Sequence, residues 1–335
     1  MIGTRRFRRA GRRTNLALLV LVAGAFLTGW LSFAAGTRVP ATLATVSHGL
    51  LGLGVVALVP WKTVIIRRAR LLWLASLLLV TLIAVCLVAG FVEVFVGFSP
   101  TARLSPIQVH VGAAIVAVPL LAWHVLRHRP QRLGRVDVSR RNLLRTGAFA
   151  VGVIAGYLGI EAVGRAAGLP SASRIATGSH QLDPQDAPPT IWLFDRVPVV
   201  SDDHRVDVAG TLLTATELAS RSTRVRARLD CTSGWYTDAD WTAVSLADLI
   251  DPSLLADAAS IEVVSVTGYR RAFPTDDAGA LWLATGFQGQ SLRPPYGAPV
   301  RLVAPGRRGF WWVKWVRSVE LSDRPAALPS PFPLQ

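Results

Sequence analysis

The residue type best suited to chemistry in this sequence is a cysteine in its C-terminal half, Cys231. It follows an alternating, strand-like stretch at residues 225–230 and precedes Thr232-Ser233-Gly234. A thiol at the end of a strand can ligate a metal or act as a nucleophile once it is ionised. The only other cysteine, Cys86, lies in a long apolar segment, where we expect a small packing residue. The alternative for Cys231 is a buried, inert thiol.

Two other classes of cysteine chemistry are not expected. Cysteine–histidine hydrolysis would require His180 or His204, and both lie in segments expected to be linker or sheet edge. The cysteines and histidines also lack the grouping that a zinc site needs.

A second set of candidate residues consists of histidines in the apolar N-terminal half. His48 and His110 lie at similar depth, near the same end of two different apolar segments. Two imidazoles at one depth on two helices suit bis-histidine ligation of a b-type haem, and neighbouring glycines leave room for a flat ring. Hydrogen bonds between helices are the alternative role.

The two remaining histidines of this half are not expected to ligate haem. His124 follows His110 by fourteen residues, which is about 21 Å along a helix. No histidine on another segment is placed to complete a site there, and His128 lies on the same helix. Both are expected at the membrane interface, and a quinone site beside them stays open as an alternative.

For His48 and His110 to lie at the same depth, the apolar segments that contain them must be helices that cross a membrane. Five segments are long and apolar enough, namely residues 15–35, 42–60, 71–92, 106–126 and 144–162. We therefore predict that residues 1–163 form an all-α transmembrane bundle of five helices. The first segment lacks a small-residue cleavage site and is expected to be a retained helix.

Charge predicts the orientation of this bundle. Residues 1–164 hold 19 Lys and Arg against 3 Asp and Glu, whereas residues 165–335 hold 17 against 18. The arginines concentrate before the first span and in the second and fourth loops, so the positive-inside rule places the N-terminus in the cytoplasm. Five spans then place the C-terminal domain of this multi-pass cytoplasmic-membrane protein outside. Because the net charge of +15 belongs to these loops, a nucleic-acid partner is not expected.

The run Ser139-Arg140-Arg141-Asn142-Leu143-Leu144-Arg145 precedes a weakly apolar, Gly- and Ala-rich segment. This arrangement resembles a twin-arginine export signal located inside the chain. Ordinary cytoplasmic loop charge is the alternative. The twin-arginine translocase moves folded proteins. If this run is an export signal, the C-terminal domain is therefore expected to acquire its cofactor before it crosses the membrane.

The C-terminal half is expected to be α+β, with strands predominating. Residues 164–190 are predicted to be a linker, 191–322 a domain and 323–335 a tail. Strands are expected at 204–208, 225–229, 261–266, 300–303 and 311–319, and short helices at 246–250 and 278–284.

An ordered series of motifs in this domain resembles the molybdopterin domain of the sulfite-oxidase superfamily. The series runs through His204-Arg205-Val206-Asp207-Val208-Ala209-Gly210, Thr216-Glu217-Leu218, Leu229-Asp230-Cys231, Trp235, Trp241, Val266-Thr267-Gly268-Tyr269, Gly297-Ala298-Pro299-Val300-Arg301 and Lys314-Trp315-Val316. The resemblance implies a mainly β, α+β molybdopterin-binding fold that takes a small-molecule substrate.

The resemblance also implies roles for individual residues. Cys231 would ligate molybdenum, for which a soft thiolate is suited. Arg301 and Lys314 would bind the pterin phosphate, and Tyr269 would lie near the metal. Gly297 and Trp235 complete the implied cofactor site.

Two departures from the family pattern narrow the expected substrate. Sulfite oxidases of this family have an arginine shortly after the cysteine, but here the chain continues Thr232-Ser233-Gly234-Trp235-Tyr236. That sequence is closer to the periplasmic methionine-sulfoxide reductase branch. Tyr296 also replaces a histidine often found before the Gly-x-Pro motif. The aromatic run Phe310-Trp311-Trp312 is expected to pack in the core or against the membrane.

Together these expectations describe a membrane-anchored, molybdenum-dependent oxidoreductase. Oxygen-atom transfer outside the membrane would be coupled to haem b in the bundle and to a quinone pool. The alternative is a non-catalytic membrane protein whose outer domain keeps the fold for binding or assembly.

Overall fold

The computed structural model describes residues 2–69, 74–97, 104–128, 139–189, 196–201 and 203–327. The chain divides into two compact units. The first, here called the helical unit, comprises Met1–Ser32 and Thr42–His180, and the second, the sheet unit, comprises Phe33–Ala41 and Gln181–Gln335. Several predicted segments extend outside the described ranges, namely at residues 71–73, residues 190–195 and residues 328–335.

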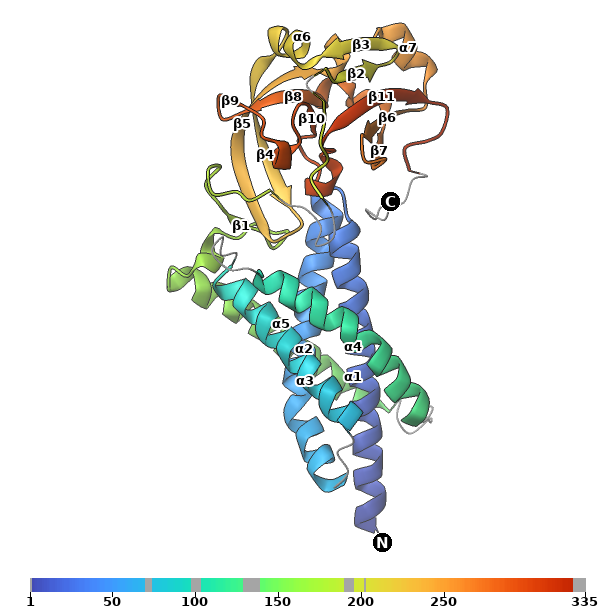
Figure 1. Cartoon of the computed structure of the whole chain (residues 1–335). Helices are drawn as coiled ribbons and strands as arrows, with labels where there is room; N and C mark the ends of the chain where they lie inside the picture. The colour runs from blue at the N-terminus through green and yellow to red at the C-terminus, as the bar shows by residue number, and fades with distance from the viewer. Residues whose placement is uncertain are drawn as a thin grey trace. The chain divides into compact units, whose positions relative to one another are not determined.

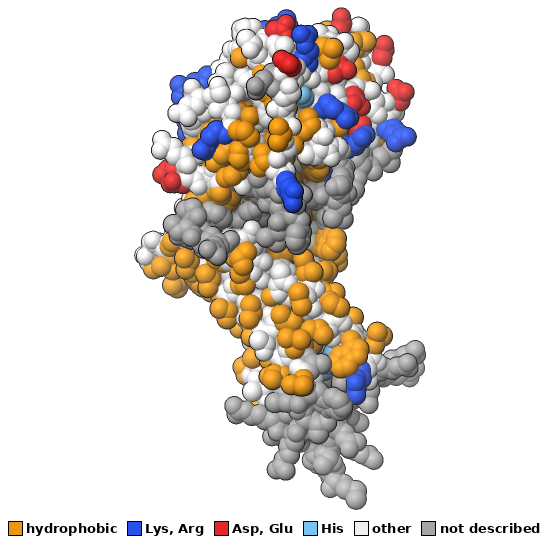
Figure 2. Space-filling model, viewed as in Figure 1, with side chains coloured by type: hydrophobic (Ala, Val, Ile, Leu, Met, Phe, Trp, Pro, Cys, Tyr) orange, Lys and Arg blue, Asp and Glu red, His pale blue; other side chains and the backbone are white. Residues whose placement is uncertain are grey.

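The helical unit is built from five long helices in the described residues (Figure 1). They are α1 (Ile2–Ala34), α2 (Arg38–Ala69), α3 (Leu74–Phe95), α4 (Pro106–His128) and α5 (Arg140–Ala166). Each contains a stretch of 20 to 27 residues that is long and apolar enough to cross a membrane. Hydrophobic side chains dominate the visible face of this unit (Figure 2), as expected for helices that meet lipid.

Small residues lie where these helices approach one another. On α1, Gly24 faces Leu51 of α2, and the hydroxyls of Ser32 and Thr45 are 2.7 Å apart. On α2, Gly49 faces the ring of Tyr157 from α5. These contacts hold α1, α2 and α5 at close range.

The first sheet of the sheet unit contains six strands. Its order is β1-β5-β8-β10, with β4 paired to β5 and β9 paired to β8. The strands are β1 (His180–Gln181), β4 (Thr223–Cys231), β5 (Trp235–Ser245), β8 (Trp282–Phe287), β9 (Gln290–Ser291) and β10 (Arg301–Val303). The hairpin of β4 and β5 pairs Cys231 with Trp235 at its closed end.

The second sheet contains five strands in the order β3-β2-β11-β6-β7. They are β2 (Arg205–Val208), β3 (Thr211–Thr214), β6 (Ser260–Ser265), β7 (Arg270–Phe273) and β11 (Val316–Ser322). Strands β2 and β11 are parallel, and the other pairs are antiparallel.

Short helices complete the sheet unit. They are α6 (Ala215–Ser220), α7 (Pro252–Asp257), η3 (Leu246–Asp248), η4 (Thr275–Ala280), η5 (Pro294–Tyr296) and η6 (Gly309–Trp311). Helix α6 begins with a capping box, in which Thr214 and Glu217 exchange hydrogen bonds. The element η2 (Pro170–Ser173) belongs to the helical unit.

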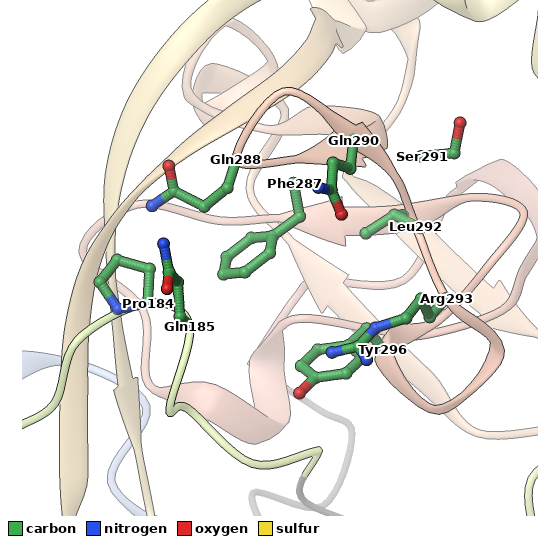
Figure 3. A pocket seen from close by; sticks show the side chains of 9 residues that line it. All are labelled: Pro184, Gln185, Phe287, Gln288, Gln290, Ser291, Leu292, Arg293 and Tyr296. Atoms are coloured by element: carbon green, nitrogen blue, oxygen red, sulfur yellow. The ribbon is translucent and has the colours of Figure 1, made fainter.

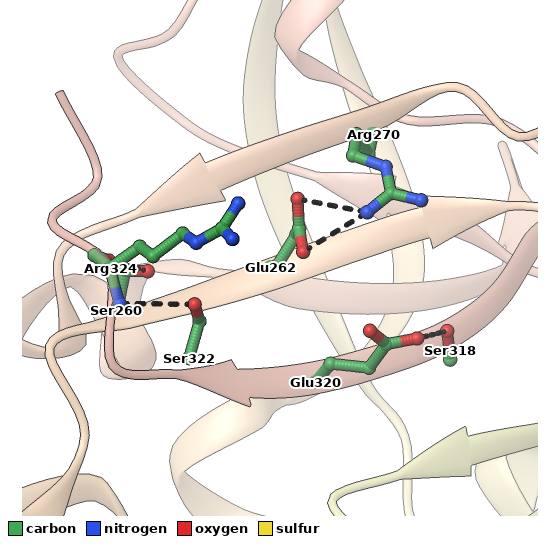
Figure 4. A network of polar contacts seen from close by, with 7 residues as sticks. All are labelled: Ser260, Glu262, Arg270, Ser318, Glu320, Ser322 and Arg324. Carbon is green, nitrogen blue, oxygen red and sulfur yellow. Dashed lines mark hydrogen bonds and ion pairs between the residues drawn. The ribbon is translucent and has the colours of Figure 1, made fainter. Parts of the chain in front are cut away.

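One apolar core serves both sheets. Its fully buried members include Val206 and Ile261 from the second sheet and Trp241, Leu283 and Leu302 from the first. On β6, β7 and β11, polar side chains contact one another. Arg270 pairs with Glu262, and the buried Ser318 donates to Glu320 (Figure 4).

The expected α+β, strand-rich architecture is confirmed, and two expected elements are wrong. Residues 311–319 are not one strand, because η6 ends at Trp311 and β11 begins only at Val316. Residues 278–284 are not one helix, because η4 ends at Ala280 and β8 begins at Trp282. In both cases a continuous apolar run conceals a change of element within the core.

The boundary between the units also differs from the expected linker. The expected linker spans residues 164–190, whereas the division between the units falls between His180 and Gln181. His180 is 4% exposed and its Nε2 donates to the carbonyl oxygen of Glu93. Part of the expected linker is therefore packed structure of the helical unit.

Candidate functional site

Cys231 is the last residue of β4 and is 4% exposed. The turn to β5 contains Gly234 at φ 90°, a backbone conformation that favours glycine. The backbone N–H of Ser233 points at the cysteine sulfur, with 3.5 Å between N and Sγ. A Cβ added to Gly309 would lie 3.7 Å from this sulfur and 3.1 Å from the Cα of Cys231. The thiol therefore occupies a tight site between a hairpin turn and the start of η6.

A buried ion pair lies next to the cysteine. The Nε of Arg308 is 3.5 Å from Oδ2 of Asp230, and the Arg308 side chain is 5% exposed. The backbones of these residues also form a parallel bridge, and the Arg308 N–H donates to the carbonyl oxygen of Gly36. Because breaking a buried ion pair is costly, this pair fixes the backbone on both sides of Cys231.

Gly297 brings two cationic residues together. It adopts φ 105°, and an added Cβ would lie 3.0 Å from the Cβ of Arg301 and 3.1 Å from that of Lys314. A side chain at this position would therefore be strained and would separate the two cations.

Arg301 is 3% exposed and is held above the rings of Trp241 and Trp312. Its Nη1 donates to the carbonyl oxygen of Tyr296, while its buried Nε has no hydrogen-bond partner in the described part of the chain. Burial lowers the pKa of Arg301 to about 10, and the charge of Cys231 opposes this change. A buried guanidinium with donor capacity to spare is suited to an anionic ligand.

Lys314 is placed beside Arg301. Its Nζ donates to the carbonyl oxygen of Pro295 at 3.0 Å. Burial lowers the pKa of Lys314 to about 7, repulsion from Arg301 adds to the decrease, and Cys231 opposes it. An anion bound between these cations would remove much of the cost of burying them.

Trp235 begins β5 and is 2% exposed. Its indole Nε1 is buried and has no hydrogen-bond partner among the described residues. Because buried donors are normally satisfied, this group is available to a ligand beside Cys231.

The hydroxyl of Tyr269 is engaged by the protein. It donates to the carbonyl oxygen of Phe310 at 2.6 Å and accepts from Nε of Arg271 at 2.7 Å. Burial raises the pKa of Tyr269, and the positive charge of Arg271 opposes the rise. Phe310 follows Gly309, so the phenol is coupled to the segment that contacts Cys231.

Two arginines of this region were missed by the sequence analysis. Arg271 is 1% exposed and lies over the rings of Tyr269, Phe310 and Trp311. Arg308 is the other. The one signal in the sequence was that Arg270-Arg271 directly follows the motif that ends at Tyr269.

The aromatic run at 310–312 serves two purposes. Trp312 is 2% exposed and belongs to the core, as expected. Phe310 and Trp311 instead surround Arg271. Trp311 also packs against the core, as expected, and the rings of Phe310 and Trp311 in addition enclose a cation next to Tyr269.

An open pocket of about 390 Å³ borders the Gly297 turn (Figure 3). Its lining residues are Pro184, Gln185, Phe287, Gln288, Gln290, Ser291, Leu292, Arg293 and Tyr296. Tyr296, which replaces the family histidine, donates its hydroxyl to the carbonyl oxygen of Ala187. Its ring stacks on Phe287 and lies beneath Arg293, so Tyr296 has a packing role here.

In the helical unit, His48 and His110 come together as the sequence analysis expected. Their ring centroids are 5.6 Å apart and the rings are nearly perpendicular. Nδ1 of His48 lies 2.8 Å from the carbonyl oxygen of Ala25, and Nδ1 of His110 lies 2.7 Å from that of Cys86. These contacts place the ring proton on Nδ1 and leave each Nε2 as the atom able to bind a metal.

The two histidines have equivalent surroundings. An added Cβ at Gly29 would lie 3.1 Å from the ring of His48, and one at Gly90 would lie 3.0 Å from the ring of His110. Each carbonyl that accepts from a histidine belongs to the residue four positions before that glycine. The hairpins α1–α2 and α3–α4 thus present their imidazoles in the same way.

Comparison with known proteins identifies the sheet unit. Residues 195–329 match the family model described as "Oxidoreductase molybdopterin binding domain". A nitrate reductase [NADPH] from Mycosarcoma maydis is 40% identical over 58 residues, which are 17% of this chain and 6% of that protein. The sulfane dehydrogenase SoxCD of Paracoccus pantotrophus has a solved structure that is 24% identical, with a TM-score of 0.34, covering 38% of this chain and 40% of that one.

The chain thus spans only a small part of the nitrate reductase and under half of the sulfane dehydrogenase chain. The family match covers the cysteine, the Gly297 turn and both buried cations. Residues 195–329 of the sheet unit are therefore similar to oxidoreductase molybdopterin-binding domains, and this match supports a molybdenum oxidoreductase.

Proposed function

We propose that this protein is a membrane-anchored molybdenum oxidoreductase in which Cys231 ligates the metal and His48 and His110 ligate a haem b. The observation that carries the proposal is the position of Cys231. It is buried, it lies within a molybdopterin-binding domain, and its charge acts on both buried cations, Arg301 and Lys314.

The residues present fit a molybdopterin. Arg301 and Lys314 supply two buried cations for its phosphate, and Gly297 lets their side chains lie side by side. The unsatisfied Nε of Arg301 and Nε1 of Trp235 would gain acceptors. When bound, the molybdenum centre supplies oxygen-atom transfer coupled to two electrons.

Protein groups around Cys231 would orient a small substrate. The Asp230–Arg308 pair holds the backbone of the cysteine, and the Tyr269 hydroxyl donates to the carbonyl oxygen of Phe310, the residue after Gly309. Because Thr232-Ser233-Gly234 replaces the arginine of sulfite oxidases, we assign a neutral sulfoxide in preference to sulfite. Reduction of a sulfoxide consumes two protons and two electrons and yields a sulfide and water.

Electrons would reach the metal from the helical unit. The two imidazoles of His48 and His110 each leave Nε2 available, which suits the two axial positions of a haem iron. The five apolar helices would cross the cytoplasmic membrane, with the N-terminus inside and the sheet unit outside. A quinone pool in that membrane would supply the electrons.

Export of the sheet unit would use the Arg140-Arg141 pair at the start of α5. The twin-arginine translocase carries folded domains, so the molybdopterin would be inserted in the cytoplasm. Insertion of the cofactor before export is consistent with the burial of Cys231 in the folded domain.

The experiment follows the haem spectrum of purified protein that has been reduced with stoichiometric dithionite and then given methionine sulfoxide. We expect reoxidation of the haem in the wild type and in Cys86→Ala, and none in Cys231→Ala. Reoxidation that is equally fast in Cys231→Ala would contradict the proposed role of the cysteine.

A further inference from the structure

A buried carboxylate lies at the end of α3. Glu93 is 8% exposed, and neither of its carboxylate oxygens makes a hydrogen bond of normal geometry in the described part of the chain. Burying an ionisable group without a partner is costly in a protein interior and in a membrane. A group of this kind is expected to have a function.

His180 lies beside the same turn. It is 4% exposed, and its Nε2 donates to the carbonyl oxygen of Glu93 at 2.8 Å. Its Nδ1 is also buried without a hydrogen-bond partner among the described residues. An added Cβ at Gly97, which adopts φ 74°, would lie 2.6 Å from this nitrogen, so only glycine leaves room for the imidazole.

Charged groups of neighbouring elements surround these two side chains. Arg174 forms an ion pair with Glu161 of α5 and acts electrostatically on both Glu93 and His180. The backbone N–H of Ile107, in the first turn of α4, attracts the Glu93 carboxylate. Burial lowers the pKa of His180, and contacts with the carbonyls of Glu93 and Pro170 oppose this change. Burial thus favours the neutral imidazole, in which Nε2 carries the proton that is donated to Glu93.

The position of Glu93 connects it with the histidine pair. It follows Gly90 by three residues, or about 4.5 Å along the helix axis, and Gly90 is in contact with the ring of His110. A redox-active ligand at Glu93 would therefore lie within about one helical turn of the proposed haem.

Exposed apolar residues occur at the end of α3 and before the start of α4. Val92 and Val96 are 38% and 59% exposed, and Leu104 is 54% exposed. A lipophilic ligand can approach such a surface from the hydrocarbon region of a bilayer.

We propose that Glu93 and His180 bind the headgroup of a membrane quinol and accept its protons when it is oxidised. The inference rests on the haem and the membrane location of the proposed function. Oxidation of the quinol to the quinone breaks two O–H bonds and releases two protons and two electrons. One proton would pass to the Glu93 carboxylate and the other to Nδ1 of His180. A haem held by His48 and His110 would take the two electrons one at a time, and would give up the first before it takes the second.

The other end of α4 offers a competing location. His124 follows His110 by fourteen residues, which places it about 21 Å further along the helix. A quinol bound there would be far from the pair of His48 and His110. The two locations predict different mutational sensitivities.

The experiment compares full-length wild type with Glu93→Gln, His180→Gln and His124→Gln. Two measurements are made on each. The first is the rate at which reduced menadiol, a quinol, reduces the haem, with dithionite giving total reducible haem. The second is binding of 2-n-heptyl-4-hydroxyquinoline N-oxide, a quinol analogue, followed by quenching of its fluorescence, which requires no turnover.

We expect at least a tenfold slower reduction by menadiol in Glu93→Gln and in His180→Gln, with unchanged reduction by dithionite. The analogue should bind at least tenfold more weakly to both variants and normally to His124→Gln. Equal menadiol rates and equal analogue binding in wild type and Glu93→Gln would overturn this site while leaving the haem intact. Loss of both properties in His124→Gln alone would overturn it in favour of the other end. Absence of any haem from the wild type would instead contradict the proposed function, and analogue binding would still test the site.

Discussion

The functional groups of the two units are positioned in different ways. In the sheet unit, Cys231, Gly297, Arg301 and Lys314 come from segments spread over more than eighty residues, and strand register brings them together. In the helical unit, His48 and His110 are each placed by one hairpin, through a glycine and a backbone carbonyl on the neighbouring helix. The first site thus depends on the whole fold, and the second on two local and equivalent pieces.

The polar groups of the two sites also differ. In the sheet unit, Nε of Arg301 and Nε1 of Trp235 are buried donors that have no hydrogen-bond partner among the residues the structure describes. Such donors suit an anionic, hydrogen-bonding ligand. In the helical unit, both Nδ1 atoms contact backbone carbonyl oxygens, and Nε2 of His110 lies 3.9 Å from the sulfur of Cys86. The comparison predicts that each cofactor can be removed without loss of the other.

The largest expected effect is complete loss of haem. Replacement of His48 or His110 by Ala removes an axial ligand, so the low-spin b-type spectrum of dithionite-reduced protein should disappear. Molybdenum content, measured by elemental analysis, should remain unchanged. His124→Ala is the matched control and should keep the spectrum. A haem spectrum that persists in His48→Ala would contradict the assignment of His48 and His110 as the haem ligands.

The next effect concerns export. In Arg140→Lys/Arg141→Lys, positive charge is kept, so α1–α4 should still insert by the positive-inside rule. Residues 165–335 should nevertheless remain in the cytoplasm, because the folded-protein translocase requires the arginines. Protease added from outside would report the location. If the domain is still digested in the double variant, the pair is ordinary loop charge.

A smaller effect is expected when the phosphate-binding cations are removed singly. Arg301→Gln and Lys314→Met each remove a charge-assisted hydrogen bond of about 1.5–3 kcal/mol. The cofactor should therefore dissociate about tenfold to hundredfold more readily. Retained pterin can be measured by fluorescence of its oxidised form. Arg228→Gln, on the exposed side of β4, should have no effect, and equal losses in all three variants would refute the assignment.

The smallest effect is a pH dependence of stability in cofactor-free protein. Because burial lowers the pKa of Lys314 to about 7, the unfolded chain binds more protons than the folded one above that pH. Stability should therefore rise with pH from about 7 toward the ordinary lysine pKa of about 10.4. Thermal unfolding of wild type and Lys314→Met should show that this part of the slope is absent in the variant. Parallel slopes would mean that Lys314 is not buried as a cation.

This difference between the two units explains how much of each site could be predicted from the sequence. The helices and the meeting of His48 and His110 follow from apolar length and residue counting, because a helix has a fixed rise per residue. In the sheet unit, Cys231, Arg301 and Lys314 were found through family motifs, and the structure brings them together. Their proximity could not be derived from spacing, since it depends on which strands pair.

Two residues that the sequence analysis missed show more clearly what could not be predicted from the sequence. Arg308 meets Asp230 through a backbone bridge between β4 and a loop that lies nearly eighty residues later. Arg271 is buried because it occupies an inward position on β7, within a ring of aromatic side chains. In sequence, each is one of two adjacent arginines, and only the tertiary structure distinguishes the buried from the exposed member.

The central claim is that the lone buried cysteine of the sheet unit holds molybdenum. The direct test is elemental analysis of purified Cys231→Ser beside Cys86→Ser, with haem content as the internal standard. The account predicts about one molybdenum per haem in wild type and in Cys86→Ser, and loss of the metal in Cys231→Ser with haem unchanged. Full molybdenum in Cys231→Ser, with an unchanged metal spectrum, would contradict the account.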